Sequence, residues 1–252
     1  MFNRILIKHL LFLKESGHYM RNYKISNWLF YQGDDSRAWQ KDFEDESWNT
    51  ITIPHDWSVS QPFNKSNSSG TGYLPGGIGW YRCHLPLTDL SILDNSVVQL
   101  TFDGVYKNAQ VWVNGYNQGI RPSGYSSFTF DITEILQYAP NNELVIAVRV
   151  DHSDIADSRW YNGSGITRNV WLEIHDPIFI EKYGTTYSTL EYKNESSNIF
   201  IEHMITNTHT TTSEVTIVND LVAMNEEQTY HFEKRIKLQS HETSSISFNE
   251  SL

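Results

Sequence analysis

The chain has 252 residues, of which 39% are hydrophobic, 13% are aromatic and 19% are charged. This length suffices for one or two domains with a buried core, and the abundance of aromatic residues argues against a disordered chain. The net charge of −11 disfavours binding to nucleic acid or to anionic membranes, because both require basic surface patches. No apolar run is long enough to span a membrane, and the single cysteine, Cys83, excludes an internal disulfide.

The N-terminal segment, residues 1–19, differs from the rest of the chain. Its apolar residues between Ile5 and Leu13 resemble the centre of a signal peptide, but Lys8 and His9 interrupt them and no small cleavage-site residues follow. We therefore expect no signal peptide. The segment is either a leader that results from a start assigned upstream of Met20, and then dispensable, or a short amphipathic helix packed on the domain.

After Met20, alternating apolar residues predict short β-strands. Residues 143–151 place one set of side chains on a single face, namely Leu144, Ile146, Val148 and Val150. Ala109–Val113 is a second apolar run, and the Asn114-Gly115 pair that follows predicts a tight hairpin, because both turn positions need positive φ. Many short strands separated by Gly, Asn and Pro predict an all-β jelly-roll sandwich over residues 20–176.

The composition changes near Asp176-Pro177. Trp171 is the last tryptophan, and Thr, Ser and Asn become more frequent after it. Further strands are expected at residues 197–206, 214–219 and 230–239. This pattern is typical of an immunoglobulin-like sandwich, which needs about seven strands in roughly 100 residues. We therefore expect residues 177–252 to form a small or truncated immunoglobulin-like domain.

Most catalytic and cofactor motifs are missing from the chain. No nucleophile-elbow, zinc-protease, phosphate-loop or dinucleotide motif occurs, and no His or Cys spacing supports a metal site. The glycine-rich segment 70–79 precedes a strand rather than a helix, so it is a loop or a surface where backbone approaches a ligand. The acidic residues between Asp42 and Glu46 are expected to form a solvated turn. The sequence thus predicts no catalytic residue, no metal and no cofactor.

One segment, Ile53–Ser58, combines polar groups with an aromatic ring. Asp56 stands directly before Trp57, and sugars are bound by planar polar groups beside an aromatic face. Asp56 is therefore a candidate substrate-binding residue. The alternative is that Trp57 is buried and that its neighbours bond to the loop backbone.

A second segment, residues 157–171, contains two arginines, three aromatic rings and two glycines. Arg159 lies between Asp157 and Trp160, so a rigid donor group stands next to an aromatic surface. We expect Arg159 to project from one end of the sandwich, where functional loops gather. The alternative is a structural arginine that pins the loop.

Five motifs in order carry a resemblance to a known family. They are Pro54-His55-Asp56-Trp57-Ser58, the run Leu74–Arg82, Phe102-Asp103-Gly104-Val105-Tyr106, Val111-Trp112-Val113-Asn114-Gly115 and the run Ser158–Val170. Together they resemble the N-terminal sugar-binding domain of β-galactosidases from glycoside hydrolase family 2, over residues 25–174. The residues after Pro177 are more weakly similar to the immunoglobulin-like domain that follows in the family.

The resemblance implies that the chain is the non-catalytic N-terminal part of a retaining exo-β-galactosidase that acts on terminal β-D-galactosides. Family members carry two catalytic glutamates on a (β/α)8 barrel, which takes about 250 residues and has no counterpart here. We therefore expect the chain to be inactive alone and to have the missing barrel as its partner. The alternatives are a stand-alone carbohydrate-binding module, or the same part of a β-glucuronidase or β-mannosidase.

The resemblance also implies which residues meet the sugar. In the family a loop of the jelly roll reaches the rim of the active site, and residues 157–165 match this loop. The expected substrate-binding residues are Arg159, Asp157, Trp160 and Asp56. Some members have Asp at the position of Arg159, so the hydroxyl that it contacts stays open. The lack of a signal peptide and the lone cysteine favour a cytoplasmic protein, and the oligomeric state is open.

Overall fold

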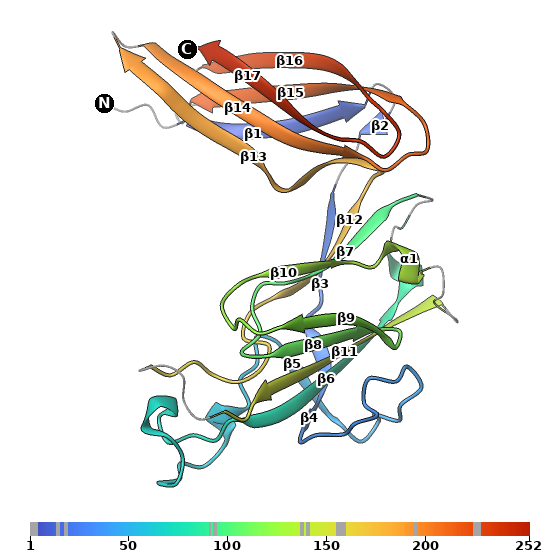
Figure 1. The fold of residues 1–252 in the computed structure, drawn as a ribbon, viewed down its shortest axis with the longest axis vertical. Coiled ribbons are helices and arrows are strands. Elements are labelled where there is room, and N and C mark those ends of the chain that lie inside the picture. The colour runs from blue at the N-terminus through green and yellow to red at the C-terminus, as the bar shows by residue number, and fades with distance from the viewer. Residues whose placement is uncertain are drawn as a thin grey trace. The chain divides into compact units, whose positions relative to one another are not determined.

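The computed structural model describes residues 5–13, 16–17, 20–90, 92, 95–136, 139, 142–154, 160–193, 196–223 and 228–252. The chain divides into two compact units. The jelly-roll unit comprises Arg21–Ile92 and Val97–Ile174, and the immunoglobulin-like unit comprises Met1–Met20, Leu93–Ser96 and His175–Leu252. Both units consist almost entirely of antiparallel strands (Figure 1), so the predicted all-β fold class is confirmed.

Two sheets form the jelly-roll unit. The six-stranded sheet has the order β5-β4-β6-β11-β8-β9 and the four-stranded sheet the order β10-β7-β12-β3 (Figure 1). The first contains β4 (Asn27–Gln32), β5 (Asn49–Thr52), β6 (Gly77–Pro86), β8 (Ala109–Val113), β9 (Tyr116–Arg121) and β11 (Glu143–His152). The second contains β3 (Arg21–Lys24), β7 (Val97–Phe102), β10 (Phe128–Asp131) and β12 (Val170–His175). The short helices are η1 (Ser58–Ser60), η2 (Ser69–Thr71), η3 (Leu87–Asp89) and α1 (Thr133–Leu136).

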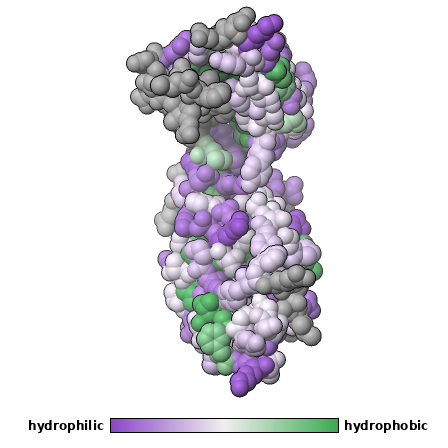
Figure 2. Space-filling model, turned by 90° about the vertical axis from the view of Figure 1, so that its left-hand side faces the viewer, coloured by the Kyte–Doolittle hydropathy of each residue, from purple (hydrophilic) through white to green (hydrophobic). Residues whose placement is uncertain are grey.

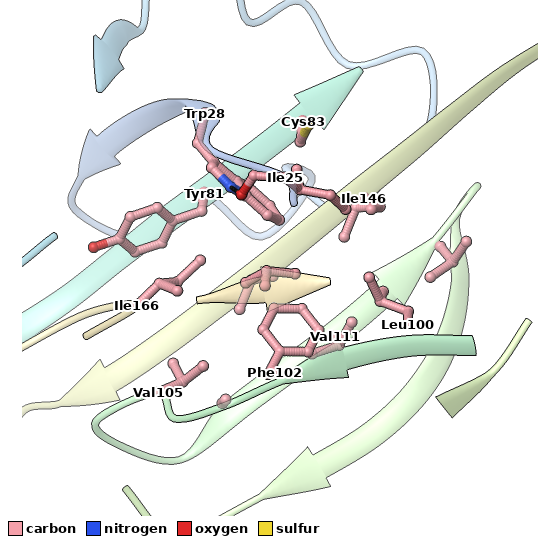
Figure 3. Packing of buried hydrophobic residues seen from close by; sticks show 14 of the residues in the cluster. Ile25, Trp28, Tyr81, Cys83, Leu100, Phe102, Val105, Val111, Ile146 and Ile166 are labelled. Atoms are coloured by element: carbon pink, nitrogen blue, oxygen red, sulfur yellow. Dashed lines mark hydrogen bonds between the residues drawn. The ribbon is translucent and has the colours of Figure 1, made fainter. Parts of the chain in front are cut away.

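The main core of this unit lies between the two sheets. Trp28 of β4 and Tyr81 of β6 point into the same space as Phe102 of β7 (Figure 3). The four residues predicted to share one face of β11 are all buried in this core. The predicted hairpin at Asn114-Gly115 is also confirmed, since it joins β8 to β9 with φ of 48° and 84° at its two residues.

A second, smaller core covers the outer face of the six-stranded sheet. Trp80 and Trp112 stack there with ring centroids 5.3 Å apart, beside Ala38 and Ala147. Both faces of β11 are therefore buried, where the alternation in the sequence predicts a half-buried strand. The reason is that segment 33–48 crosses this face of the sheet, so that small and aromatic side chains replace water on it.

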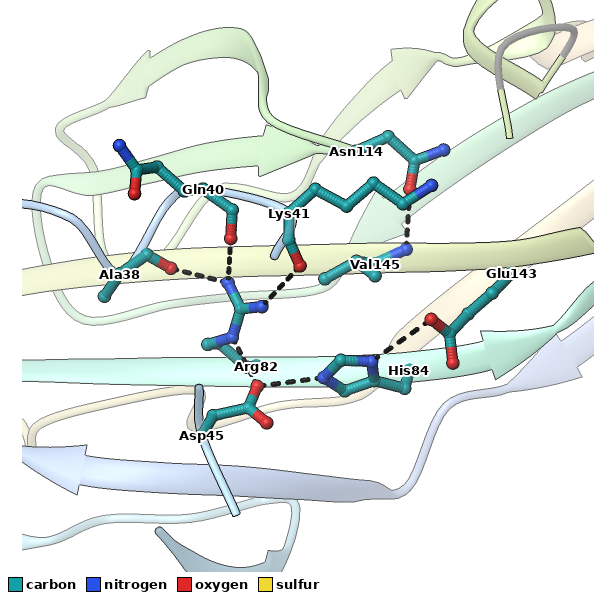
Figure 4. Close-up of polar contacts among 9 residues, drawn as sticks. All are labelled: Ala38, Gln40, Lys41, Asp45, Arg82, His84, Asn114, Glu143 and Val145. Carbon is teal, nitrogen blue, oxygen red and sulfur yellow. Dashed lines mark hydrogen bonds and ion pairs between the residues drawn. The ribbon is translucent and has the colours of Figure 1, made fainter. Parts of the chain in front are cut away.

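Hydrogen bonds from the buried Arg82 side chain hold segment 33–48 on the sheet (Figure 4). Its guanidinium donates to the carbonyl oxygens of Ala38 (2.6 Å), Gln40 (2.9 Å) and Lys41 (3.2 Å), and it pairs with the carboxylate of Asp45. Asp45 is only 6% exposed. The expectation of a solvated acidic turn is thus wrong for this residue, because its charge is used to neutralise Arg82.

The immunoglobulin-like unit also has two sheets. One has the order β13-β14-β17, with β13 (Ile178–Lys193), β14 (Ser196–Asn207) and β17 (Thr243–Ser251). The other has the order β16-β15-β1-β2, with β15 (Ser213–Ala223), β16 (Thr229–Leu238), β1 (Ile5–Leu13) and β2 (Ser16–Gly17). Its own core is formed by Ile178, Ile199, Ile201, Ile205, Val215, Ile217, Leu221, Leu238 and Phe248.

The N-terminal strand β1 belongs to this second unit. It pairs antiparallel with β15, from Ile5 opposite Ala223 to Phe12 opposite Thr216. The expectation of an amphipathic helix in this segment is therefore wrong for residues 5–13. The physical reason is the edge of β15: a strand with buried side chains presents unpaired backbone groups until a neighbour bonds to them.

On the face shown in Figure 2, purple and white residues dominate the jelly-roll unit, and green residues form a small patch near its lower end. None of the helices among the described residues is long and apolar enough to cross a membrane.

Candidate functional site

Two loops of the jelly-roll unit lie side by side and form the candidate site. The His55 amide donates to the Ile166 carbonyl at 2.8 Å, and the Trp57 amide donates to the Ser164 carbonyl at 3.1 Å. These bonds join residues 53–58 to residues 160–167. Between the loops lies a cavity of about 290 Å³, lined by Pro54, His55, Asp56, Tyr161, Asn162, Gly163 and Thr167.

Asp56 connects the two loops. Its Oδ1 accepts hydrogen bonds from the backbone amides of Ser58 (3.0 Å) and Ser164 (2.9 Å), and its Oδ2 accepts one from the Tyr161 hydroxyl (2.5 Å). Partial burial, together with this carboxylate, raises the pKa of Tyr161 well above its ordinary value. Tyr161 therefore stays protonated and remains a donor. Asp56 lines the cavity and holds the loop that carries Tyr161, and its predicted role in binding substrate stays a prediction.

Three buried polar side chains, hydrogen-bonded in series, hold the same loop in place. The Ser58 hydroxyl lies 2.7 Å from the Ser164 hydroxyl, which lies 2.7 Å from Nδ1 of His152. All three residues are buried, so Ser164 is placed to hold the loop rather than to attack a substrate. Gly165 makes the close packing possible, because a Cβ there would lie 2.2 Å from the Tyr81 hydroxyl at a φ of +129°.

The aromatic residue next to Asp56 belongs to the core. Trp57 is 1% exposed, its Nε1 donates to the Gly76 carbonyl at 3.1 Å, and its ring stacks on Phe30. The sugar-stacking interpretation of Trp57 is therefore wrong, and the alternative of a buried tryptophan is confirmed. Burial also lowers the pKa of His55, which lies 2.8 Å from the Tyr81 hydroxyl and is neutral at neutral pH.

Exposed rings lie beside the cavity. Trp160 and Tyr161 are 62% and 41% exposed, the opposite of Trp57. The Trp160 Nε1 donates to the Tyr125 hydroxyl at 2.9 Å, and that hydroxyl is bonded to Oδ1 of Asn162. Asn162 lines the cavity, so these bonds connect Trp160 to the cavity wall.

Of the four predicted residues, Asp56 lines the cavity, and Trp160 is connected to the cavity wall through Tyr125 and Asn162. Arg159 and Asp157 lie outside the described residues, so their roles stay predictions. Tyr125 was missed by the sequence analysis. It stands in a loop of Pro, Ser and Gly residues 35 positions before Trp160, and no local pattern connects the two. Among the described residues there is no group of His, Cys, Asp or Glu side chains that could hold a metal ion.

Comparison with known proteins identifies the family. Residues 31–177 match the family described as "Glycosyl hydrolases family 2, sugar binding domain". The chain belongs to glycoside hydrolase family 2. This assignment confirms the resemblance carried by the five motifs, and it covers both loops of the cavity.

Family 2 relatives include enzymes with different substrate names. The chain is 38% identical over 198 residues to β-galactosidase BoGH2A of Bacteroides ovatus, which covers 78% of this chain and 23% of that protein. It is 36% identical over 170 residues to a putative β-glucuronidase of Formosa agariphila, covering 67% of this chain and 16% of that protein. The chain therefore spans less than a quarter of the length of either relative.

Solved family 2 structures share the fold. A family 2 member from Bacteroides cellulosilyticus superposes with a TM-score of 0.80 at 29% identity, covering 92% of this chain and 30% of that chain. β-Glucuronidase 2 of Bacteroides uniformis gives a TM-score of 0.79 at 24% identity, covering 92% and 28%. The second likeness concerns the fold alone.

Proposed function

We propose that this chain is the non-catalytic N-terminal part of a family 2 enzyme, a retaining exo-β-galactosidase that hydrolyses terminal β-D-galactosides. The observation that carries the proposal is the cavity between loops 53–58 and 160–167, which lies within the segment matched to the family's sugar-binding domain. The choice of β-galactoside is supported by the 38% identity to BoGH2A over most of the chain.

The chemistry of the cavity suits binding rather than hydrolysis. Retaining glycosidases need two carboxyl groups about 5–5.5 Å apart, one as acid and base and the other as nucleophile. The described residues that line the cavity include one carboxylate, Asp56, and its oxygens already accept three hydrogen bonds. We therefore place the catalytic pair on another domain of the parent protein, the barrel that the family resemblance implies.

In this proposal the loop that contains Asp157, Arg159 and Trp160 completes the sugar subsite of the parent enzyme. Trp160 offers an exposed ring, and the guanidinium of Arg159 would offer a planar donor group for sugar hydroxyls. Tyr161 and Asn162 add polar groups on the cavity wall.

The proposal is tested by assaying the purified chain and the barrel-containing parent protein on p-nitrophenyl β-D-galactopyranoside and on the matching β-glucuronide. We expect no turnover by the chain, turnover of the galactoside by the parent, and a loss of kcat/KM in the parent on Arg159→Ala. The sequence leads us to expect that Arg159 projects into solvent, and surface substitutions rarely alter stability by more than about 0.5 kcal/mol, so the same substitution should leave the melting temperature of the chain unchanged.

A second candidate is the same part of a β-glucuronidase, favoured by the 36% identity to the Formosa relative. Preference of the parent for the glucuronide would establish this alternative. Turnover by the chain itself, retained after host enzymes are removed, would contradict a non-catalytic role.

A further inference from the structure

We propose that the edge of β15 is a strand-acceptor site, which recognises the N-terminal strand β1 through two polar positions in its sequence. Main-chain hydrogen bonds hold an added strand on a sheet edge, and alternate side chains provide the specificity. The occupant is the segment 5–13 of the same chain, which pairs with β15 over eight positions. The inference concerns the immunoglobulin-like unit and is independent of the function proposed for the cavity.

The place that β1 occupies belongs to other strands in an immunoglobulin sandwich. There the second strand pairs with the first and the fifth, while the third pairs with the sixth and the sixth with the seventh. β14 pairs with β13 and β17, so these three match the second, first and fifth strands. β15 is the third strand, and β1 and then β2 stand beside it in the places of the sixth and seventh (Figure 1). Residues from the beginning of the sequence thus extend a sheet that β15 and β16 begin.

Chain connectivity does not set the register of β1 on β15. The jelly-roll residues 21–92 and 97–174 stand between the two strands in the sequence. In a hairpin the turn fixes the register, whereas strands this far apart depend on the pattern of their side chains. The sequence of β1 must therefore carry the information that places it.

Two polar residues of β1 stand opposite two polar residues of β15. Lys8 is at the register position opposite Asp220, and His9 is at the position opposite Asn219. The two positions on either side of this pair are apolar in both strands, from Leu6 to Leu11. The lysine and histidine that interrupt the apolar N-terminal run therefore coincide with an aspartate and an asparagine.

The polar residues of β15 are themselves held in place. Asn219 is fully buried among apolar core residues, and its Oδ1 lies 2.8 Å from Nε2 of His203, which belongs to β14 of the other sheet. Asp220 follows it on the opposite face of the strand and pairs with Nδ1 of His231 at 2.7 Å. The acceptor therefore presents one polar position on each face.

Other registers lose this match. A slip of one residue would exchange the two faces of β1. A slip of two residues would keep the faces but set His9 opposite Ile217 or Leu221. Lys8 would then stand opposite a valine instead of an aspartate. Opposite charges on facing positions stabilise a strand pair, so the observed register is the one that the two sequences favour.

The test uses cross-strand disulfides in the complete 252-residue chain. Phe12→Cys stands opposite Thr216→Cys, within reach of a disulfide, whereas Glu214→Cys is offset from it by two residues. Cys83 does not compete, because burial raises the pKa of its thiol to about 12. The rate of disulfide formation is measured with oxidised glutathione as the oxidant.

The matched variant moves the polar pair along β1 by two residues. It carries Lys8→Leu, His9→Leu, Leu10→Lys and Leu11→His, which keeps the composition of the segment unchanged. We expect the 12–216 disulfide to form in the wild-type background and the 12–214 disulfide not to form. In the variant the 12–216 disulfide should form at least about tenfold more slowly, because two facing pairs are mismatched.

A donor added in trans tests the acceptor itself. A peptide of residues 1–19 with Phe12→Cys should link to the full chain carrying Ile7→Asp, Leu11→Asp and Thr216→Cys, in which the chain's own β1 is weakened. The peptide with the moved polar pair should link at least about tenfold more slowly.

Three results would overturn the inference. Equal rates with and without the moved polar pair would show that the polar positions do not select the register. A peptide that fails to link, while the disulfide within the chain forms, would show that β15 accepts no strand in trans. Disulfides that form between two chains rather than within one would assign the site to a second copy.

Discussion

At the scale of single residues, buried charge is the clearest determinant of this structure. Arg82 is fully buried, and its guanidinium donates hydrogen bonds to four acceptors. They are the Asp45 carboxylate and the carbonyl oxygens of Ala38, Gln40 and Lys41. His84 extends the cluster, with Nε2 2.9 Å from Asp45 and Nδ1 3.5 Å from Glu143 (Figure 4). A buried charge is tolerated only when it is paired and hydrogen-bonded, so Arg82 dictates the path of segment 33–48.

Arg82→Met should destabilise the jelly-roll unit strongly. The substitution leaves the Asp45 carboxylate buried and three carbonyl groups without their donor, so the free energy of unfolding should fall by about 3–5 kcal/mol. Arg37→Met is the control in the same segment, because the Arg37–Asp35 pair is exposed and worth at most about 1 kcal/mol. Urea unfolding followed by tryptophan fluorescence measures both. Equal, small effects would show that the Arg82 cluster does not hold the segment.

Acid should weaken the same unit. Burial alone would raise the pKa of Asp45, but bonds from His84 and Arg82 outweigh it and hold the pKa below the ordinary 3.8. Arg149 likewise lowers the pKa of Asp34. A lowered pKa in the folded state stabilises the protein above the unfolded-state pKa, and this contribution disappears as the pH falls through the folded-state value.

The urea midpoint of wild type should therefore be constant above about pH 7, begin to fall below about pH 6.5, where the unfolded state protonates His55 more readily than the folded state does, and fall further below about pH 4. Asp45→Asn should be less stable at pH 7 and should lose part of this acid dependence. A midpoint that rises on acidification would contradict the assignment.

At the scale of elements, the N-terminal strand is the unexpected one. Residues 5–13 pair with β15 over eight positions, and β15 carries the buried side chains of Val215, Ile217 and Leu221. The other neighbour of β15 is β16, so β1 occupies an edge that would otherwise expose backbone groups beside the core.

A variant that starts at Met20 should thus be less stable, which is the opposite of the dispensable leader expected from the sequence. Loss of β1 should lower the melting temperature of the immunoglobulin-like unit by at least about 4 °C, as judged by circular dichroism. The melting of the jelly-roll unit should not change. If both transitions stay unchanged, residues 1–19 contribute nothing to the sheet.

At the scale of the whole molecule, each of the two units has a main hydrophobic core of its own. One lies in the jelly-roll unit and the other in the immunoglobulin-like unit, and no residue is shared between them. All eight tryptophans fall in the jelly-roll unit. Tryptophan fluorescence therefore reports the unfolding of one unit, whereas circular dichroism reports both.

We expect calorimetry to show two unfolding transitions, because units with separate cores need not unfold together. The fluorescence transition should coincide with one of them only. A single transition that is identical by all three methods would show that the two units unfold as one.

Much of the fold was predictable from local patterns. The strand β11 and the Asn114-Gly115 turn depend on neighbouring residues alone, so the sequence predicted both, although it did not predict that both faces of β11 are buried. The order of the five family motifs likewise predicted the family that the comparison established. The structure of the N-terminal segment was not predicted correctly. Its nine apolar-rich residues do not indicate which distant strand they pair with.

The sequence by itself determined the fold class, the family and the loops that form the candidate site, because each of these depends on residue type and order along the chain. Only the tertiary structure decided that Trp57 is buried while Trp160 is exposed, since burial depends on which segments pack on a side chain. The same holds for Asp45, drawn into the interior by Arg82, and for Tyr125, brought to Trp160 across 35 residues. Hydrogen bonds between residues far apart in the chain produce no periodic pattern in the sequence. Their partners can therefore be identified only from the folded structure.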